Sequence, residues 1–279
     1  MTIAARLTVA QLGSYRPGAM QIARAAEMPR AAPAETVGSP HEPGIARAIA
    51  ALDFEAVSAS FRQQGEFIFL EHFLPEELVA VMIAEARQLR PAVHRAYFPY
   101  IRKAGAIGHS SIASAAPALE ALYRSPSFLD FSSRLCAAPL ALKNDRDAHA
   151  AALYVYDREG DHVGFHYDDC GCEGSASYTA SFGLINDTQS KVHFQLFRKD
   201  PGREMQELYV PMTPGSLVFF CGSRAYHRVT PLRRGEERVV YSFAHVREGR
   251  RLTGFWRLVE NVKDAALYFG PRAIFQDNY

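Results

Sequence analysis

The hydrophobic pattern changes character about halfway along the chain. In the first half, apolar residues recur at helical spacing, and Pro75 stands where a helix can begin, with acidic residues in the following turn. Turn residues and a short apolar run separate these helical segments. The pattern predicts helices over 44–63, 75–89, 116–123 and 126–135 and a strand over 67–70, which together form a helical part covering residues 45–137.

After residue 138 the pattern becomes one of short apolar runs separated by Gly, Pro and Asn, as is typical of antiparallel strands. Roughly eight strands at this spacing indicate a barrel or double-sheet roll, with the preceding helices on one outer face. We therefore expect a mainly β fold with a helical layer, in one domain over 45–260 whose β-core is 138–260. The predicted strands are 150–156, 178–185, 192–197, 207–210, 216–221, 239–246 and 252–258.

The two ends of the chain show no such pattern. Residues 1–44 are rich in Ala, Pro, Gly and Arg without sustained periodicity, which predicts a low-complexity extension, and 261–279 form a C-terminal tail. Apolar runs stay well short of the ~20 residues that span a bilayer, and the N-terminus lacks the apolar region of a secretory signal. Together with only four cysteines, this predicts a cytoplasmic protein without a membrane partner.

Charge gives no overall reason to bind nucleic acid, because the 279 residues carry a formal net charge of +1. Arginines outnumber glutamates between residues 224 and 257, which is a modest local excess. The expected partner is a small-molecule substrate, and the sequence leaves the oligomeric state open.

The residues with the clearest chemistry are His166, Asp168 and His227. Side chains two positions apart on an extended segment point the same way, so His166 and Asp168 can reach one metal, and a histidine from a later strand can complete a triangle. Two imidazoles and one carboxylate leave the other positions of an ion open, as in non-haem Fe(II) oxygenases. The alternative is that these are ordinary core or surface residues, since ten histidines produce some such pairs by chance.

The order of parts around these residues resembles that of the Fe(II)- and 2-oxoglutarate-dependent dioxygenases, particularly the prolyl-4-hydroxylase-like branch and related bacterial amino-acid hydroxylases and halogenases. The resemblance covers about residues 62–247 and is strongest over 154–168 and 214–243. It implies a double-stranded β-helix of the jelly-roll or cupin type, with Fe(II) held by His166, Asp168 and His227. Fe(II), 2-oxoglutarate and O2 are the implied cofactors, with ascorbate as a reductant.

The same resemblance implies a binding site for 2-oxoglutarate. Arg238 lies 11 positions after His227, where the family typically has a basic residue for the distal carboxylate, and the planar guanidinium suits a carboxylate. An exposed arginine in the charged run 233–238 is the alternative. Tyr154 and Tyr156 are candidate contacts of 2-oxoglutarate, although a backbone carbonyl would satisfy either hydroxyl equally well.

Two comparisons with the family and two further candidate sites refine this expectation. Relatives that chlorinate have Gly or Ala in place of the carboxylate ligand, so Asp168 favours hydroxylation or a desaturation-type outcome. The Gly-Gly-x-Thr turn of prolyl hydroxylases is missing after the ligand strand, which argues against a prolyl peptide as substrate. Asp169 is a candidate contact for a substrate amine, with a solvated loop acid as the alternative. Cys170 and Cys172 are either a metal or redox pair or incidental thiols in a glycine-containing loop.

The leading hypothesis is hydroxylation of an unactivated C–H bond in an amino acid or natural-product intermediate, with release of succinate and CO2. A second hypothesis applies the same chemistry to a protein side chain or alkylated nucleic acid, for which the arginine excess gives slight support. A third is a non-catalytic or differently metallated β-barrel that binds a carboxylate ligand.

Overall fold

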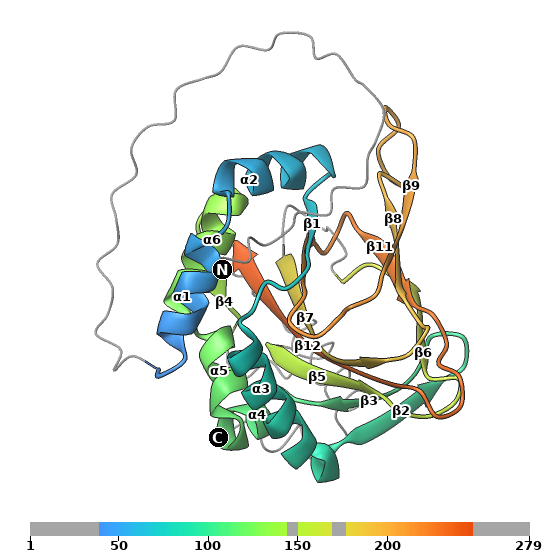
Figure 1. The fold of residues 1–279 in the computed structure, drawn as a ribbon. Helices are drawn as coiled ribbons and strands as arrows, with labels where there is room; N and C mark the ends of the chain where they lie inside the picture. Colours follow the sequence, from blue (N-terminus) through green and yellow to red (C-terminus); the bar gives the residue numbers. More distant parts are fainter. Residues whose placement is uncertain (1–38, 144–149, 169–176, 248–279) are drawn as a thin grey trace, which may run out of the picture.

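The computed structural model describes residues 39–143, 150–168 and 177–247, and Figure 1 shows its helices gathered on one side of a curved sheet. The helices are α1 (Glu42–Ala50), α2 (Phe54–Gln63), α3 (Glu76–Gln88), α4 (His109–Ala115), α5 (Pro117–Tyr123) and α6 (Pro126–Leu135), with the short 3-10 helix η1 (Arg90–Ala92). The strands are β1 (Phe67–Leu70), β2 (His94–Phe98), β3 (Arg102–Ile107), β4 (Leu140–Leu142), β5 (Ala151–Tyr156), β6 (His162–His166), β7 (Ser177–Asp187), β8 (Val192–Leu196), β9 (Gln206–Val210), β10 (Leu217–Cys221), β11 (Tyr226–Val229) and β12 (Glu237–Arg247).

The predicted helix over 44–63 is two helices, so that expectation was wrong in one respect. The Asp53 side chain accepts a hydrogen bond from the Ala56 amide at 3.1 Å and thereby caps a new helix, α2. Ile45 in α1 and Val57 and Phe61 in α2 are all buried in the same core. The apolar periodicity therefore continued across a break in the backbone and concealed it.

The strands form one continuous antiparallel sheet that curls into a nearly closed barrel. The strand order is β1-β10-β7-β12-β5-β3-β6-β11-β8-β9, with β2 on β3 and β4 on β12. This confirms a mainly β fold of the double-stranded β-helix type. The described residues contribute twelve strands, more than the roughly eight expected, because none of the predicted strand ranges covers β2, β3, β4, β6 or β11. The predicted strand 252–258 lies outside the described residues.

The apolar core consists of two layers, one between the helices and the sheet and one inside the barrel. Phe219 packs in the layer between the helices and the sheet, whereas its neighbours Val218 and Phe220 pack inside the barrel. All five residues of β10 are buried, as expected for a strand covered on both faces. The predicted helical layer on one outer face is confirmed by the helix-side core, which includes Phe61, Phe73, Phe128, Phe131, Phe182 and Phe243.

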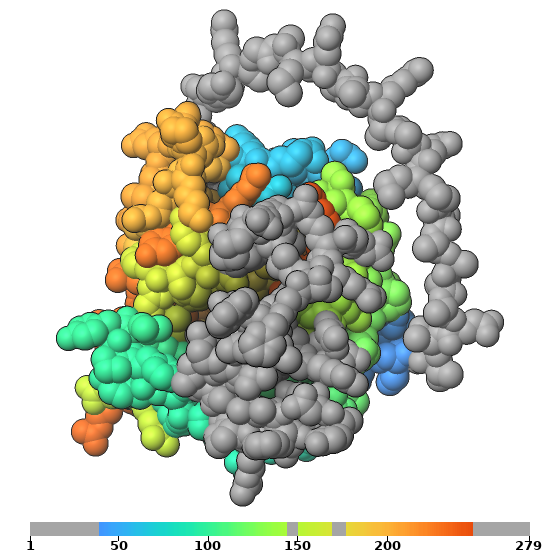
Figure 2. Space-filling view, turned by 180° about the vertical axis from the view of Figure 1, so that it is seen from behind, coloured from blue at the N-terminus to red at the C-terminus, as the bar shows by residue number. Residues whose placement is uncertain are grey.

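The barrel wall away from the helices carries two projecting hairpins, β2–β3 (green) and β8–β9 (orange), on one side of the view in Figure 2. Between them along the sheet lie β6 and β11, which pair with each other. Within the part of the chain that the structure describes, no helix is long and apolar enough to cross a membrane.

Candidate metal centre

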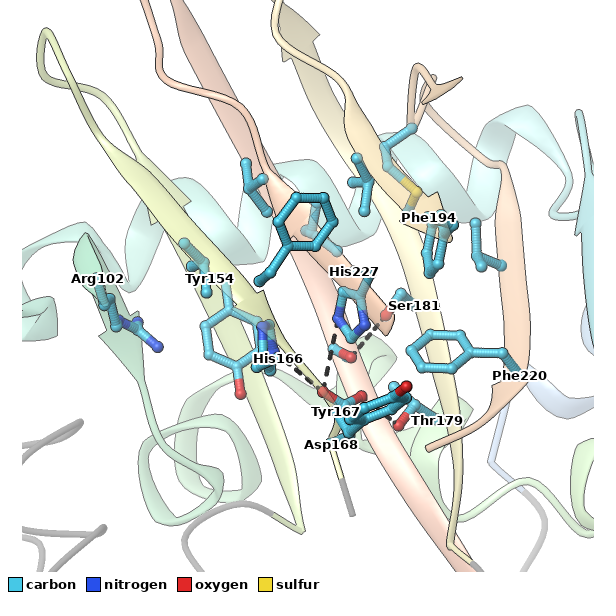
Figure 3. A pocket seen from close by; sticks show the side chains of 18 of the residues that line it. Arg102, Tyr154, His166, Tyr167, Asp168, Thr179, Ser181, Phe194, Phe220 and His227 are labelled. Atoms are coloured by element: carbon cyan, nitrogen blue, oxygen red, sulfur yellow. Dashed lines mark hydrogen bonds and ion pairs between the residues drawn. The ribbon is translucent and has the colours of Figure 1, made fainter. Parts of the chain in front are cut away.

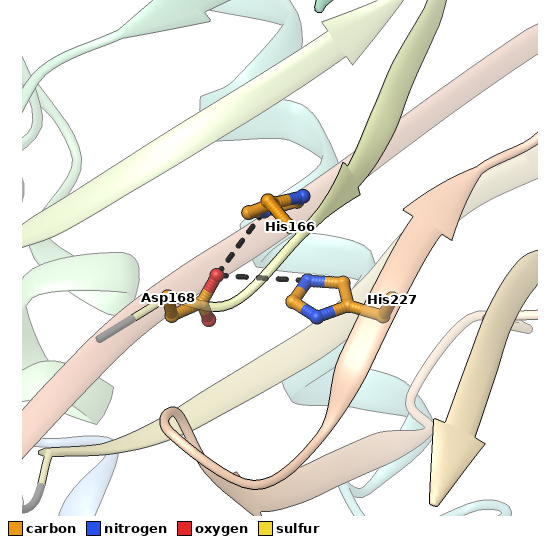
Figure 4. A group of neighbouring side chains, drawn as sticks. All are labelled: His166, Asp168 and His227. Carbon is orange, nitrogen blue, oxygen red and sulfur yellow. Dashed lines mark ion pairs between the residues drawn. The ribbon is translucent and has the colours of Figure 1, made fainter. Parts of the chain in front are cut away.

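His166, Asp168 and His227 converge at the barrel interior, as the sequence predicted. His166 ends β6, and β11 places His227 directly opposite it in the antiparallel register. One Asp168 oxygen, Oδ1, lies 3.2 Å from Nε2 of His166 and 3.6 Å from Nε2 of His227 (Figure 4). One ligand atom from each residue lies within 4.8 Å of the other two. Two imidazoles and one carboxylate thus face one point, an arrangement that fits a divalent transition metal.

Both imidazoles are held in the tautomer that a metal requires. Nδ1 of His166 lies 2.9 Å from the Gly164 carbonyl oxygen, and Nδ1 of His227 lies 3.2 Å from that of Ala225. A carbonyl can only accept, so each Nδ1 carries the proton and donates it. Each Nε2 lone pair is therefore directed to the common point, which is how ligand histidines are oriented in metal sites.

The carboxylate of Asp168 is also held in place. Thr179 on β7 donates a hydrogen bond from its hydroxyl to Oδ2 at 2.7 Å, leaving Oδ1 to face the imidazoles. Burial alone would raise the pKa of Asp168. His227, which is protonated at the low pH where Asp168 titrates, and the hydrogen bonds from His166 and Thr179 outweigh burial and hold that pKa well below its usual range. The carboxylate therefore stays ionised, as a metal ligand must be.

Aromatic rings enclose His227 on two sides. Phe194 stacks on its ring at a centroid distance of 5.1 Å, and Phe220 meets it edge to face at 5.1 Å (Figure 3). Burial, together with the nearby His166, lowers the pKa of His227 to about 4. Burial also acts to lower the pKa of His166, but the hydrogen bond and charge of Asp168 outweigh it and raise that pKa. His227 is thus neutral at physiological pH, and His166 is the imidazole at which a proton would compete with a metal ion.

The three residues line a cavity of about 550 Å³ that also contains Arg238. Arg238 is 0% exposed, and its Nη2 donates to the Ser190 carbonyl, whereas Nε and Nη1 have no hydrogen-bond partner among the described residues. Burial lowers the pKa of Arg238 to about 10, against the opposing effect of Tyr156 and Glu236. An arginine buried with two unpaired donor atoms is costly unless an anion pairs with it, so the cavity fits a carboxylate ligand at this end.

Tyr154 and Tyr156 lie on the cavity side of β5, as their spacing of two predicted. Tyr156 is the direct cross-strand neighbour of Arg238. The ring of Tyr154 lies beneath the guanidinium of Arg102, whose Cζ is 5.2 Å from the ring centroid. Their contact with 2-oxoglutarate stays a prediction, with Tyr156 the better placed of the two.

Three residues around His166, Asp168 and His227 could not be assigned a role from the sequence. Thr179 could have been found, because Ser177, Thr179 and Ser181 place hydroxyls at every second position of an otherwise apolar strand and all three line the cavity. Arg102 is 2% exposed and also lines the cavity, but it belongs to the hairpin that was not predicted. Gly164 gave no signal in the sequence. Asp169, Cys170 and Cys172 lie outside the described residues.

No protein-family model and no curated protein matches this sequence. Solved structures share the fold, among them the epimerase SnoN of nogalamycin biosynthesis in complex with Fe3+ and α-ketoglutarate, at 18% identity and TM-score 0.57 over 74% of this chain and 88% of that chain. A Trichoplax adhaerens prolyl hydroxylase matches at 13% identity and TM-score 0.57 over 72% of this chain and 91% of its own. A Pseudomonas putida prolyl-4-hydroxylase matches at 20% identity and TM-score 0.50 over 71% and 99%. The resemblance drawn from the sequence is thus confirmed at the level of the fold.

Proposed function

We propose that this chain is an Fe(II)- and 2-oxoglutarate-dependent oxygenase. One observation carries the proposal: a convergent set of two histidines and one aspartate shares a cavity with a buried arginine that has two unpaired donor atoms. The metal site alone would fit several ions, and the arginine alone would fit any small acid. Their combination suits a ligand that chelates iron at one end and presents a carboxylate at the other.

Each residue of the site has a defined part in this proposal. His166, Asp168 and His227 would hold Fe(II) through Nε2, Oδ1 and Nε2, with the carbonyls of Gly164 and Ala225 fixing the two imidazoles. Thr179 keeps Asp168 turned so that Oδ1 faces the ion. Phe194 and Phe220 exclude water from one side of the site.

Arg238 would bind the distal carboxylate of 2-oxoglutarate through its guanidinium, whose Nε and Nη1 have no hydrogen-bond partner among the described residues. A planar guanidinium can hold a carboxylate by two parallel hydrogen bonds, from Nη2 together with either Nε or Nη1. One hydrogen of Nη2 is donated to the Ser190 carbonyl, which fixes the orientation of the guanidinium, and its second hydrogen is available to the carboxylate. Tyr156, next to Arg238 across the strands, would complete this end of the pocket.

When bound, the iron and 2-oxoglutarate supply an oxidation in which O2 converts 2-oxoglutarate to succinate and CO2 and a substrate C–H bond to C–OH. Asp168 fills the position that a halide takes in chlorinating relatives, so hydroxylation is the proposed outcome. The cavity of about 550 Å³ is within the range of small-molecule sites. We therefore retain an amino acid or natural-product intermediate as the proposed substrate class.

Succinate formation tests this proposal. Purified protein with Fe(II), ascorbate and 2-oxoglutarate should release succinate and CO2 in equal amounts, slowly without substrate and faster with a suitable one. His227→Ala and Arg238→Met should abolish this release. Arg234→Met is the matched control, because Arg234 is exposed and lies four residues before Arg238. No succinate from the wild-type protein under any condition, or full activity in Arg238→Met, would refute the proposal.

A further inference from the structure

The turn between β2 and β3 lies directly against the strand that carries His166. The turn is closed by a hydrogen bond from the Ile101 amide to the Phe98 carbonyl at 3.0 Å, and Tyr100 within it has a φ of 65°. The Gly164 amide of β6 donates to the Ile101 carbonyl at 2.7 Å. Positive φ is unfavourable for tyrosine, so this turn is held by its contacts rather than by local preference.

The carbonyl group of Gly164 faces the metal site. Its carbonyl oxygen accepts the hydrogen bond from Nδ1 of His166 at 2.9 Å. A single residue thus bonds the turn through its N–H and a proposed metal ligand through its C=O. His227 is oriented by Ala225, whose amide bonds Cys221 instead, so only one of the two imidazoles is connected to the turn.

Only glycine fits at position 164 without movement. A Cβ there would lie 2.6 Å from the carbonyl oxygen of Tyr100 and 3.3 Å from that of Ile101. Both atoms belong to the backbone, so the turn or the strand would have to shift. Gly164 does not have the positive φ that favours glycine for conformational reasons. Its lack of a side chain therefore serves the close approach of the turn.

The pairing of β6 with β11 is irregular at the same place. His166 pairs with His227 and Val163 with Val229, so the three-residue step on β6 faces a two-residue step on β11. Such a bulge changes which way a side chain points, and here both Val163 and His166 line the cavity. Gly164 lies within the bulge, so a shift of this residue would alter the direction of His166.

We propose that Gly164 is a positioning residue that couples the 98–101 turn to His166, so that the conformation of the turn sets the metal affinity of the site. The inference rests on the metal site of the proposed function. Because such coupling is reciprocal, a bound metal should also stabilise the turn. Tyr100 and Ile101 are 95% and 62% exposed and line the cavity, so the turn forms a solvent-exposed part of the cavity wall.

Co(II) binding measured by its visible absorption tests the coupling without turnover or 2-oxoglutarate. Gly164→Ala should weaken Co(II) binding about tenfold, the usual effect of disturbing a group that orients a metal ligand. Tyr100→Pro should do the same, because proline cannot adopt a φ near 65°. Tyr100→Gly, which tolerates that φ, should bind Co(II) like the wild type.

Gly105→Ala is the matched control for a steric change in the same hairpin. Its added Cβ would lie 2.5 Å from a side-chain carbon of Val93, away from Gly164. This variant should lose thermal stability but bind Co(II) within twofold of the wild type. If Gly164→Ala fails to fold, Tyr100→Pro in its exposed turn decides the matter.

The reciprocal effect is measured by chymotrypsin cleavage after Tyr97 and Tyr100, which are both exposed. Co(II) should slow cleavage at these two sites in the wild type and have less effect in Gly164→Ala. Co(II) affinities of Gly164→Ala or Tyr100→Pro within twofold of the wild type would overturn the coupling while leaving the proposed function intact. Failure of the wild-type protein to bind Co(II) would overturn the metal site and the coupling together.

Discussion

The buried charge of Arg238 should destabilise the folded protein until 2-oxoglutarate binds. Burial lowers its pKa from the usual arginine value of ~12.5 to about 10. Since one pKa unit corresponds to about 1.4 kcal/mol, holding this charge in the barrel costs about 3 kcal/mol of unfolding free energy. The folded-state pKa is the lower one, so this cost is fully present at neutral pH and declines only as pH rises above about 10.

Replacing Arg238 with methionine removes the charge while keeping a long, flexible side chain that can fill the space. The substitution leaves the Ser190 carbonyl without its donor, which costs about 1 kcal/mol. The ligand-free variant should therefore be more stable than the wild type by about 2 kcal/mol in urea denaturation at pH 7. Arg234→Met, which removes an exposed arginine, should leave the unfolding free energy unchanged.

When the urea denaturation is repeated with 2-oxoglutarate and a redox-inert metal, the wild type should become more stable than Arg238→Met. A ligand at 100 times its dissociation constant stabilises the folded state by about 2.7 kcal/mol, so the wild type should gain about this amount and Arg238→Met almost none. The reasoning would be refuted by a ligand-free Arg238→Met that is less stable than the wild type. It would equally be refuted by a variant that 2-oxoglutarate stabilises as much as the wild type.

Three further predictions concern the proposed metal ligands and the residues that contact them. Thr179→Val removes the hydroxyl that orients Asp168 and should weaken Co(II) binding about tenfold in an absorption titration, whereas an unchanged affinity would assign Thr179 to packing alone. Phe220→Ala should lower the unfolding free energy by about 3–5 kcal/mol, measured by calorimetry. It should also weaken Co(II) binding, measured by titration, because the His227 ring loses its edge-to-face contact with Phe220. As pH falls through the raised pKa of His166, one proton should compete with each Co(II) ion, so the Co(II) dissociation constant should rise tenfold per pH unit. A dependence on two protons in that pH range would contradict the pKa of about 4 for His227.

The convergence of His166, Asp168 and His227 and most of the barrel could be predicted because the sequence signals for them are local. Alternation places His166 and Asp168 on one side of an extended segment, and the apolar strands around His227 and Arg238 stand between clear turn residues. Arg238 begins an apolar strand, which favoured burial over the exposed alternative, and its side chain is fully buried. These features need no knowledge of which strands pair.

The parts that could not be predicted depend on distant contacts. The hairpin 94–107 contains Pro99, Gly105 and several basic residues, which obscure its alternation, and it is ordered by pairing with both β5 and β6. The capping role of Asp53 was concealed by an apolar pattern that continues across it. Gly164 becomes notable only because the Tyr100 carbonyl, in the turn between β2 and β3, approaches it closely.

The central claim is that one cavity binds Fe(II) and 2-oxoglutarate together, and anaerobic titration tests it most directly. Adding 2-oxoglutarate to the Fe(II)-loaded wild-type protein should produce a weak visible charge-transfer band that saturates at one equivalent. The band should be missing in Asp168→Ala and Arg238→Met and present in Arg234→Met. Absence of the band in the wild-type protein, with Fe(II) bound, would contradict the account.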